Sequence, residues 1–197
     1  LSLIDETYFQ HLIEFRRILE EKRKAIKMGE NPRPYNKALV PHADYIIKSR
    51  MQFVESLNKG INYSFLPMGF SIHYKPNIRE ASRILDFEGE EMRRGKPLVG
   101  PQRDEFLITI DNKPVRLYAS EGQKRRIHLG IVLFLRKVLE EKLSDKPVLV
   151  LDEPFVYLDP MGTREILESL DGQVFISSSK PLEIHQGAKQ IILQPYN

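Results

Sequence analysis

Two adjacent carboxylates follow the most aliphatic segment of the sequence. The run 148–151 (VLVL) leads directly into Asp152 and Glu153. Such a run is typical of a strand buried on both faces, and open α/β sheets place their ligands at the carboxyl ends of these strands. Asp152 could there hold Mg²⁺, which prefers hard oxygen ligands, and Glu153 could orient or deprotonate an attacking water. A buried strand that simply ends at a turn with solvated acids would look the same, so this motif alone leaves both interpretations open.

A predicted helix start upstream carries residues suited to an anion. Ser120 fits an N-cap, Glu121 suits the positive end of the helix dipole, and Gly122 lets backbone amides approach a ligand closely. Helix amino termini bind phosphate readily, although an ordinary capped helix is the commoner case. The order of the motifs favours chemistry: this helix start comes first, the acidic strand follows, and the segment 157–159 (YLD) lies just beyond Glu153.

These motifs require a scaffold of alternating strands and helices, which the second half of the sequence predicts. We expect a hairpin (106–110 and 115–118), a long helix (121–143), a strand (148–151), a helix (164–170) and strands over 174–177 and 190–193. Strands that alternate with helices indicate an α/β fold with parallel core strands.

The first half of the sequence is mainly helical. Apolar residues recur at helical spacing over 8–28, the segment 29–34 (GENPRP) interrupts the pattern, and a second helical pattern continues to Asn58. We expect these helices to pair antiparallel as an arm, followed by a strand over 70–74 and a charged helix over 78–94. The segment 95–97 (GKP) then separates a helical arm domain, residues 1–95, from a second domain, residues 96–197.

Basic residues are concentrated on the first predicted helix. They could follow a DNA backbone, because phosphate neutralisation is the usual source of sequence-independent affinity. They alternate with acids, however, which is the usual pattern of a solvated helix face. The net charge of +3 permits a polyanionic partner without requiring one. The residues concerned are Arg16, Arg17, Lys22, Arg23, Lys24 and Lys27.

Several classes of protein are excluded by composition. The sequence has no cysteine, so it forms no disulfide and no cysteine-ligated metal site, and its five histidines show no metal-ligand spacing. The longest apolar stretch, 131–135, is far shorter than the roughly 20 residues that span a bilayer, and the first residues show no signal-peptide pattern. We therefore expect a soluble, cytoplasmic protein with no membrane partner.

The ordered set of motifs resembles the ATP-binding-cassette superfamily and, within it, the RecF family. Residues 120–123 (SEGQ) are similar to the signature motif, 148–153 to the Walker B strand, and 158–159 to the D-loop. The stretch 99–104 (VGPQRD) resembles a Gly-Pro-His-Arg-Asp stretch of RecF, and 173–179 (QVFISSS) resembles its strand that ends in a hydroxyl-rich switch.

The resemblance implies both a fold and a set of residue roles. The fold would be the carboxyl-terminal lobe of an ABC-type (P-loop) ATPase, residues 96–197, with a helical arm domain. The cofactors would be ATP and Mg²⁺. By this resemblance, Ser120, Gly122 and Gln123 would contact the γ-phosphate held by the opposite subunit of an ATP-dependent homodimer. Asp152 would support Mg²⁺ and Glu153 would activate water. Asp159 would contact the other subunit at the seam, and Ser178 would sense the γ-phosphate.

Two departures from the family pattern bear on activity. Glu153 stands where RecF proteins commonly carry a second aspartate, a choice closer to the wider superfamily. The sequence also contains no Gly-x-x-x-x-Gly-Lys-Ser/Thr, so the Walker A loop that cradles phosphates is missing. It therefore resembles the carboxyl-terminal part of a longer protein, and we expect the isolated chain to be inactive as an ATPase.

The function that the resemblance implies is recombinational DNA repair. The full-length protein would bind double-stranded, gapped DNA as a mediator, act with RecR and RecO, and serve DNA replication and the SOS response. A non-catalytic interaction or regulatory module of an SMC-like or cassette ATPase is the alternative, which the missing Walker A supports. A transporter subunit is disfavoured by the arm placed before the signature region and by the lack of an aromatic coupling surface.

Overall fold

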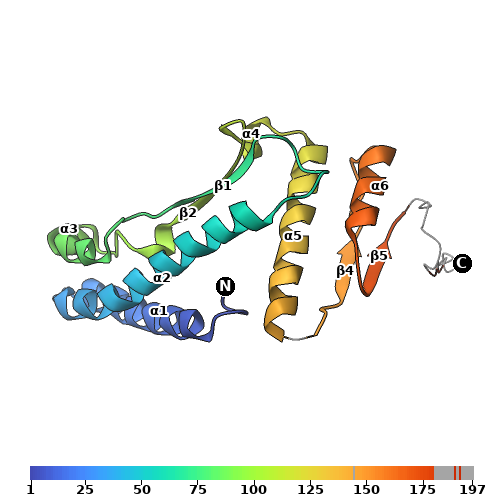
Figure 1. Ribbon diagram of the computed structural model, residues 1–197. Helices are drawn as coiled ribbons and strands as arrows, with labels where there is room; N and C mark the ends of the chain where they lie inside the picture. The colour runs from blue at the N-terminus through green and yellow to red at the C-terminus, as the bar shows by residue number, and fades with distance from the viewer. Residues whose placement is uncertain (144, 180–188, 190, 192–197) are drawn as a thin grey trace, which may run out of the picture.

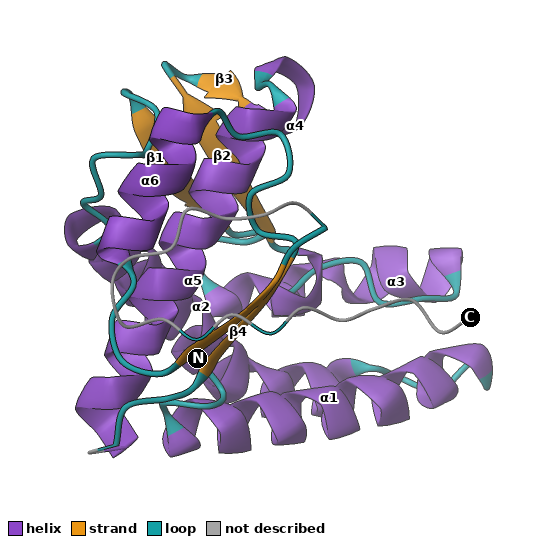
Figure 2. Ribbon diagram, turned by 90° about the vertical axis from the view of Figure 1, so that its right-hand side faces the viewer, coloured by secondary structure: helices purple, strands orange, loops and turns teal. Residues whose placement is uncertain are grey.

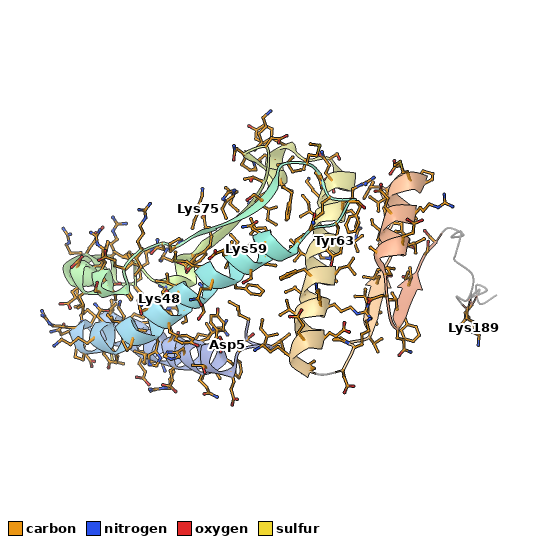
Figure 3. All side chains as sticks on the ribbon, in the orientation of Figure 1. Asp5, Lys48, Lys59, Tyr63, Lys75 and Lys189 are labelled. Atoms are coloured by element: carbon orange, nitrogen blue, oxygen red, sulfur yellow. The ribbon has the colours of Figure 1, made fainter. Side chains whose placement is uncertain are left out.

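Two long helices form the arm, as the sequence predicted. The computed structural model describes residues 1–143, 145–179, 189 and 191. Helix α1 (Glu6–Lys27) begins at Asp5, whose side chain accepts a hydrogen bond from the Tyr8 amide at 2.9 Å (Figure 3). Helix α2 (Arg33–Gly60) begins directly after Pro32, a residue whose fixed φ suits a helix start. The short connection returns α2 antiparallel along α1 (Figure 1).

The charged segment over 78–94 is not one α-helix, contrary to expectation. It divides into a 3₁₀ helix, η1 (Ala81–Phe87), and a short helix, α3 (Glu88–Arg94). Ala81, Ile84 and Phe87 recur every third residue and pack on the core between the arm helices, and three residues per turn is the 3₁₀ period. Helix α3 ends at Gly95, which adopts the left-handed conformation (φ 66°) that favours glycine.

A three-stranded antiparallel sheet lies along α2. Strand β1 (Phe70–Lys75) pairs with β2 (Glu105–Ile110), and β2 pairs with the short β3 (Lys113–Pro114). The expected strand over 115–118 is wrong, since these residues form a short helix, α4 (Val115–Tyr118). Strand β3 ends at Pro114, which has no backbone N–H to donate to a longer ladder. The pairing of β1 with β2 connects the predicted arm domain, residues 1–95, to the predicted second domain, residues 96–197. The domain boundary itself stays a prediction.

The remaining elements confirm the α/β class. Between α2 and the second sheet stands α5 (Glu121–Leu143), which runs across the direction of α1 in both views (Figures 1 and 2). Strand β4 (Leu149–Asp152) is parallel to β5 (Val174–Ser177), and α6 (Pro160–Ser169) connects them. Of the strand expected over 190–193 only Ile191 is described.

Helix α5 is held on both sides by apolar contacts. Leu129 and Leu133 share one buried cluster with Leu151 of β4 and Ile166 of α6. Phe134 belongs to a second cluster with residues of α2 and β1. Tyr63, in the loop after α2, lies beside α5 and packs against both clusters (Figure 3). The helix therefore couples the arm to the parallel strands. Within the described residues, no helix is long and apolar enough to cross a membrane.

Candidate functional site

The amino terminus of α5 is closed by two reciprocal hydrogen bonds. The Gln123 amide donates to Ser120 Oγ at 3.2 Å, and the Ser120 amide donates to Gln123 Oε1 at 2.9 Å. This capping box confirms the cap predicted for Ser120. In the part of the chain that the structure describes, the Ser120 hydroxyl proton and the Gln123 Nε2 group donate to no other group. Two donors at a positive helix end suit an anion such as phosphate.

Gly122 meets the backbone that follows the acidic strand. A Cβ at this position would lie 2.8 Å from the Tyr157 carbonyl oxygen. The sequence suggested that glycine here allows close approach of a ligand, whereas its neighbour in the structure is the segment 157–159. Gly122 therefore lets the start of α5 and the D-loop-like segment pack in direct contact.

The two acids at the end of β4 face the serines at the end of β5. Because β4 and β5 are parallel and in register, Asp152 lies opposite Ser177, whose hydroxyl donates to the Asp152 carboxylate. The Glu153 amide donates to the Ser177 carbonyl oxygen at 3.2 Å, and the Ser179 amide donates to Glu153 Oε1 at 2.6 Å. The structure thus brings Asp152 and Glu153 together with the segment 177–179, where the sequence placed the switch.

The backbone is unusual on this edge of the sheet. Glu153 and Tyr157 both have positive φ, 45° and 69°, although neither is glycine. Such conformations cost about 1–3 kcal/mol each and concentrate at functional sites, where the surrounding structure enforces them. They aim the Glu153 side chain at the segment 177–179 and turn the Tyr157 carbonyl toward Gly122.

Arg126 is a site residue that sequence reasoning missed. Its Nη2 lies 2.8 Å from Asp159 Oδ1, and its Nη1 lies 3.3 Å from Glu165 Oε2. Asp159 also caps α6, because its Oδ1 accepts from the Gly162 amide at 3.1 Å. The partners lie 33 and 39 positions from Arg126, so no local pattern pointed to it. Arg126 ties the signature-like helix to the D-loop-like segment.

The residues at this edge fit the cofactors that the motifs imply. Asp152 and the Ser177 hydroxyl offer hard oxygen atoms, and Mg²⁺ usually takes one or two carboxylates together with water and phosphate oxygens. No group of three acidic, histidine or cysteine side chains converges on a metal within the described residues. Asp152 would therefore support Mg²⁺ together with a nucleotide, while Ser120 and Gln123 would supply donors to phosphate.

The basic residues of α1 divide into exposed and buried. Lys22 is a correction, since its side chain is 0% exposed and its Nζ lies 2.7 Å from Glu91 Oε2. Burial lowers the Lys22 pKa, an effect that Glu91 opposes. Lys22 therefore fastens α3 to α1 and contributes nothing to an outer face. The other five, Arg16, Arg17, Arg23, Lys24 and Lys27, are exposed, and of these Arg17 and Arg23 pair with glutamates on α1.

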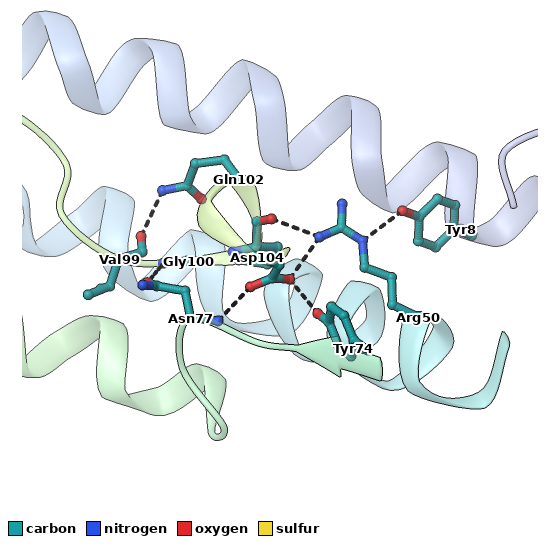
Figure 4. A network of polar contacts seen from close by, with 9 residues as sticks. Tyr8, Arg50, Tyr74, Asn77, Val99, Gly100, Gln102 and Asp104 are labelled. Carbon is teal, nitrogen blue, oxygen red and sulfur yellow. Dashed lines mark hydrogen bonds and ion pairs between the residues drawn. The ribbon is translucent and has the colours of Figure 1, made fainter. Parts of the chain in front are cut away.

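The stretch 99–104 has a structural role centred on Asp104 (Figure 4). This carboxylate, 1% exposed, accepts from Arg50 Nη1 at 2.8 Å, from the Asn77 amide at 2.8 Å and from the Tyr74 hydroxyl. Arg50 also reaches the Tyr8 hydroxyl at 3.1 Å. Burial, and next the bond to Asp104, raise the Tyr74 pKa. The network joins α1, α2, β1 and the turn before β2.

Comparison with known proteins gives relatives described as RecF. No established protein-family model matches the chain. The "DNA replication and repair protein RecF" of Moorella thermoacetica is 30% identical over 91% of this chain and 53% of the relative, and that of Clostridium novyi is 28% identical over 94% and 56%. A solved structure of "the recombination mediator protein RecF-ATP in RecFOR pathway" matches with a TM-score of 0.76 and 25% identity, covering 92% of this chain and 55% of that one. The chain spans about half the length of the curated relatives it matches.

Proposed function

We propose, from its relationship to RecF over about nine-tenths of its length, that this chain is the signature and Walker B half of an ATP-dependent DNA-repair ATPase. One observation carries the proposal. The segment 157–159 contacts Gly122 and pairs with Arg126 at the start of α5, and the acids that precede this segment contact the serines at the end of β5. Motifs far apart in the sequence thus form one continuous edge.

Each residue of this edge has a proposed role. ATP would supply the γ-phosphoryl group whose transfer to water ends the bound state. Ser120 and Gln123 donate to that phosphate across a homodimer seam, with Gly122 keeping the neighbouring backbone close, and Asp159 lies at the seam. Asp152 supports Mg²⁺ and Glu153 orients the attacking water. Ser178, between the two serines that engage these acids, senses the γ-phosphate.

Double-stranded, gapped DNA is the proposed target of the full-length homodimer. The exposed cations Arg16, Lys24 and Lys27 form no ion pair within the described residues, and Arg17 and Arg23 add charge to the same helix. Such side chains neutralise phosphates irrespective of base sequence. RecR and RecO are the proposed partners, supported by a solved neighbour described as a mediator in the RecFOR pathway. We place this activity in the cytoplasm.

A non-catalytic interaction module is the second candidate. The 197 residues contain no Walker A sequence. The strands β4 and β5 also leave Val150 72% and Phe175 55% exposed, so this sheet surface can accept another protein segment. A chain that lends its signature residues to a separate ATPase subunit would have both properties.

DNA retention with and without nucleotide tests the proposal. A full-length protein that contains this chain and a Walker A half should bind a gapped duplex at least about tenfold more tightly with ATP than without, because dimer closure brings two basic arms onto one duplex. Fluorescence anisotropy at two salt concentrations measures this. Equal affinity with and without ATP, or no ATP binding at all, would instead favour the non-catalytic module.

A further inference from the structure

Two histidines from opposite halves of the arm meet between α1 and α2. The Nδ1 atoms of His11 and His42 lie 3.0 Å apart, although the residues are 31 positions apart in the chain. The His11 ring stacks on Tyr45, with centroids 4.2 Å apart and planes 7° apart. Both imidazoles are only partly buried, so solutes can reach them. Helix pairing thus creates a constellation that sequence spacing does not reveal.

The contact between the two histidines requires that at least one of the two Nδ1 atoms carries no proton. Two Nδ1 atoms at this distance share at most one proton, because two N–H groups that point at each other would bring their hydrogen atoms into collision. Burial and then the His11 ring lower the His42 pKa, Glu14 raises it, and Arg17 lowers it further. Neutral imidazole is the form that binds metals, and the two Nδ1 atoms lie close enough together to share one cation.

We propose that His11 and His42 form a two-imidazole clip for a divalent transition cation, which would link α1 to α2. A cation about 2.0–2.1 Å from each nitrogen would subtend an angle of about 94° between them, close to that of square-planar or octahedral Cu²⁺ and Ni²⁺. Widening the nitrogen separation by about 0.3–0.4 Å gives the tetrahedral angle of Zn²⁺. Mg²⁺ and Ca²⁺ are disfavoured because they take oxygen ligands.

The rest of the coordination shell is water. No third histidine or carboxylate completes a metal-binding group in the part of the chain that the structure describes. Glu14 lies one turn after His11, but Arg17 holds its carboxylate at 2.9 Å, so Glu14 would have to exchange that partner before it could bind a metal. Two protein ligands beside an arginine give micromolar rather than nanomolar affinity.

Calorimetric titration with Cu²⁺, Ni²⁺, Zn²⁺ and Mg²⁺ tests the clip on protein free of any histidine tag. One equivalent of a transition cation should bind with micromolar affinity, and Mg²⁺ should not bind at this site. His11→Gln and His42→Gln should each weaken binding at least about tenfold, since even outer-shell changes at metal sites cost that much. His128→Gln, an exposed histidine on α5, is the matched control and should bind like wild type.

Pulsed electron paramagnetic resonance of the Cu²⁺ complex gives a readout that does not require the variants to fold identically. The wild-type protein should show two coordinated imidazole nitrogens, and His42→Gln should show one. The melting temperature should rise by about 5–10 °C at a hundredfold excess over the dissociation constant. Absence of binding at millimolar cation, or unchanged binding in a variant that carries both His11→Gln and His42→Gln, would show that the contact is only a hydrogen bond and would overturn the proposal.

Discussion

Asp152 and Glu153 are neighbours in the chain but make different contacts, so their replacement should separate two steps of ATP hydrolysis. In the full-length protein, Glu153→Gln preserves the shape of the site and removes the carboxylate that orients water. Hydrolysis should fall by about 10²–10⁴-fold, the usual contribution of a general base, while a long-lived ATP-bound dimer accumulates. Asp152→Asn should also weaken Mg²⁺-dependent nucleotide binding.

Phosphate release and sedimentation velocity with ATP distinguish these two variants. The hydroxyl of Ser177 contacts Asp152, whereas the amide of Ser179 contacts Glu153, so the effects should not be interchangeable. If Glu153→Gln hydrolysed ATP at nearly the wild-type rate, Glu153 would not be the base.

Asp159 combines a local and a proposed distant role, which two substitutions separate. Asp159→Ala removes the cap of α6 and should lower the free energy of unfolding by about 0.5–2 kcal/mol, whereas Asp159→Asn keeps a capping oxygen and should stay within a few tenths. The pair with Arg126 adds little in either case because Asp159 is 61% exposed. Urea denaturation measures both values.

The asparagine variant then isolates the seam. Asp159→Asn should be as stably folded as the wild type. If Asp159 acts across subunits, the ATP-dependent dimer of this variant should nevertheless be weaker than that of the wild type. Identical unfolding curves for the alanine and asparagine variants would show instead that the cap is unimportant.

Among individual residues, sequence reasoning succeeded where chemistry is local. The Ser120 cap follows from residue type and position in a helix, and the meeting of Asp152 with the 177–179 serines follows from parallel strands. Lys22 was misassigned because a helix pattern cannot show that α3 covers that position. Arg126 was missed for the same reason, since its partners come from distant segments.

At the scale of elements, the contact between α5 and the segment 157–159 depends on one glycine. Gly122→Ala would place a methyl group 2.8 Å from the Tyr157 carbonyl oxygen, so the loop must move. The free energy of unfolding should fall by about 1–3 kcal/mol, as for other overpacked contacts. Gly89→Ala in α3 is the control, because its Cβ would meet nothing within 4 Å and alanine favours helix.

Urea denaturation of both alanine variants tests this contact. Gly89→Ala should be neutral or slightly stabilising. Equal behaviour of the two variants would mean that the loop yields freely and that glycine at 122 serves another purpose.

The Asp104 network should give the junction of α2 and β1 a characteristic pH dependence. Tyr74→Phe leaves a 1% exposed carboxylate one donor short and should cost about 1–3 kcal/mol near pH 8. The folded-state pKa of Tyr74 is raised above the ordinary value near 10, so its stabilisation is complete below that pH and is lost as the pH rises above it.

The wild type should therefore progressively lose its advantage over Tyr74→Phe as the pH rises from about 10 toward 12. Denaturant unfolding of both proteins across this range measures the difference, in which shared alkaline effects cancel. A difference that stayed constant with pH would show that Tyr74 and Asp104 are not coupled.

Periodicity predicted the long elements well and the short ones poorly. Helices α1, α2 and α5 and strands β4 and β5 follow from extended apolar patterns. The 3₁₀ helix over 81–87 was missed because its three-residue spacing differs little from helical spacing over so short a length. The expected strand over 115–118 failed because Pro114 ended the ladder.

For the whole molecule, the sequence did not predict which segments of its first half contact segments of its second half. Strand β1 pairs with β2 some 35 residues later, and Phe134 of α5 packs with residues of α2. These contacts link the arm to the strands that carry the acids. We therefore expect α5 to transmit movements between the arm and the strands that carry the acids.

In the proposed function, the start of α5 acts on a nucleotide held by another subunit. Ser120→Arg in the full-length protein tests it, because an arginine side chain would block the seam without touching the phosphate cradle of its own subunit. ATP binding to each monomer should stay nearly unchanged, whereas ATP-dependent dimerisation and DNA retention should be lost.

Nucleotide titration and light scattering with ATP on Ser120→Arg form the decisive measurement. We expect wild-type nucleotide affinity together with a monomeric mass at ATP concentrations where the wild type is dimeric. A variant that dimerised and held DNA like the wild type would contradict it, and the capping box of Ser120 and Gln123 would then be an ordinary helix start.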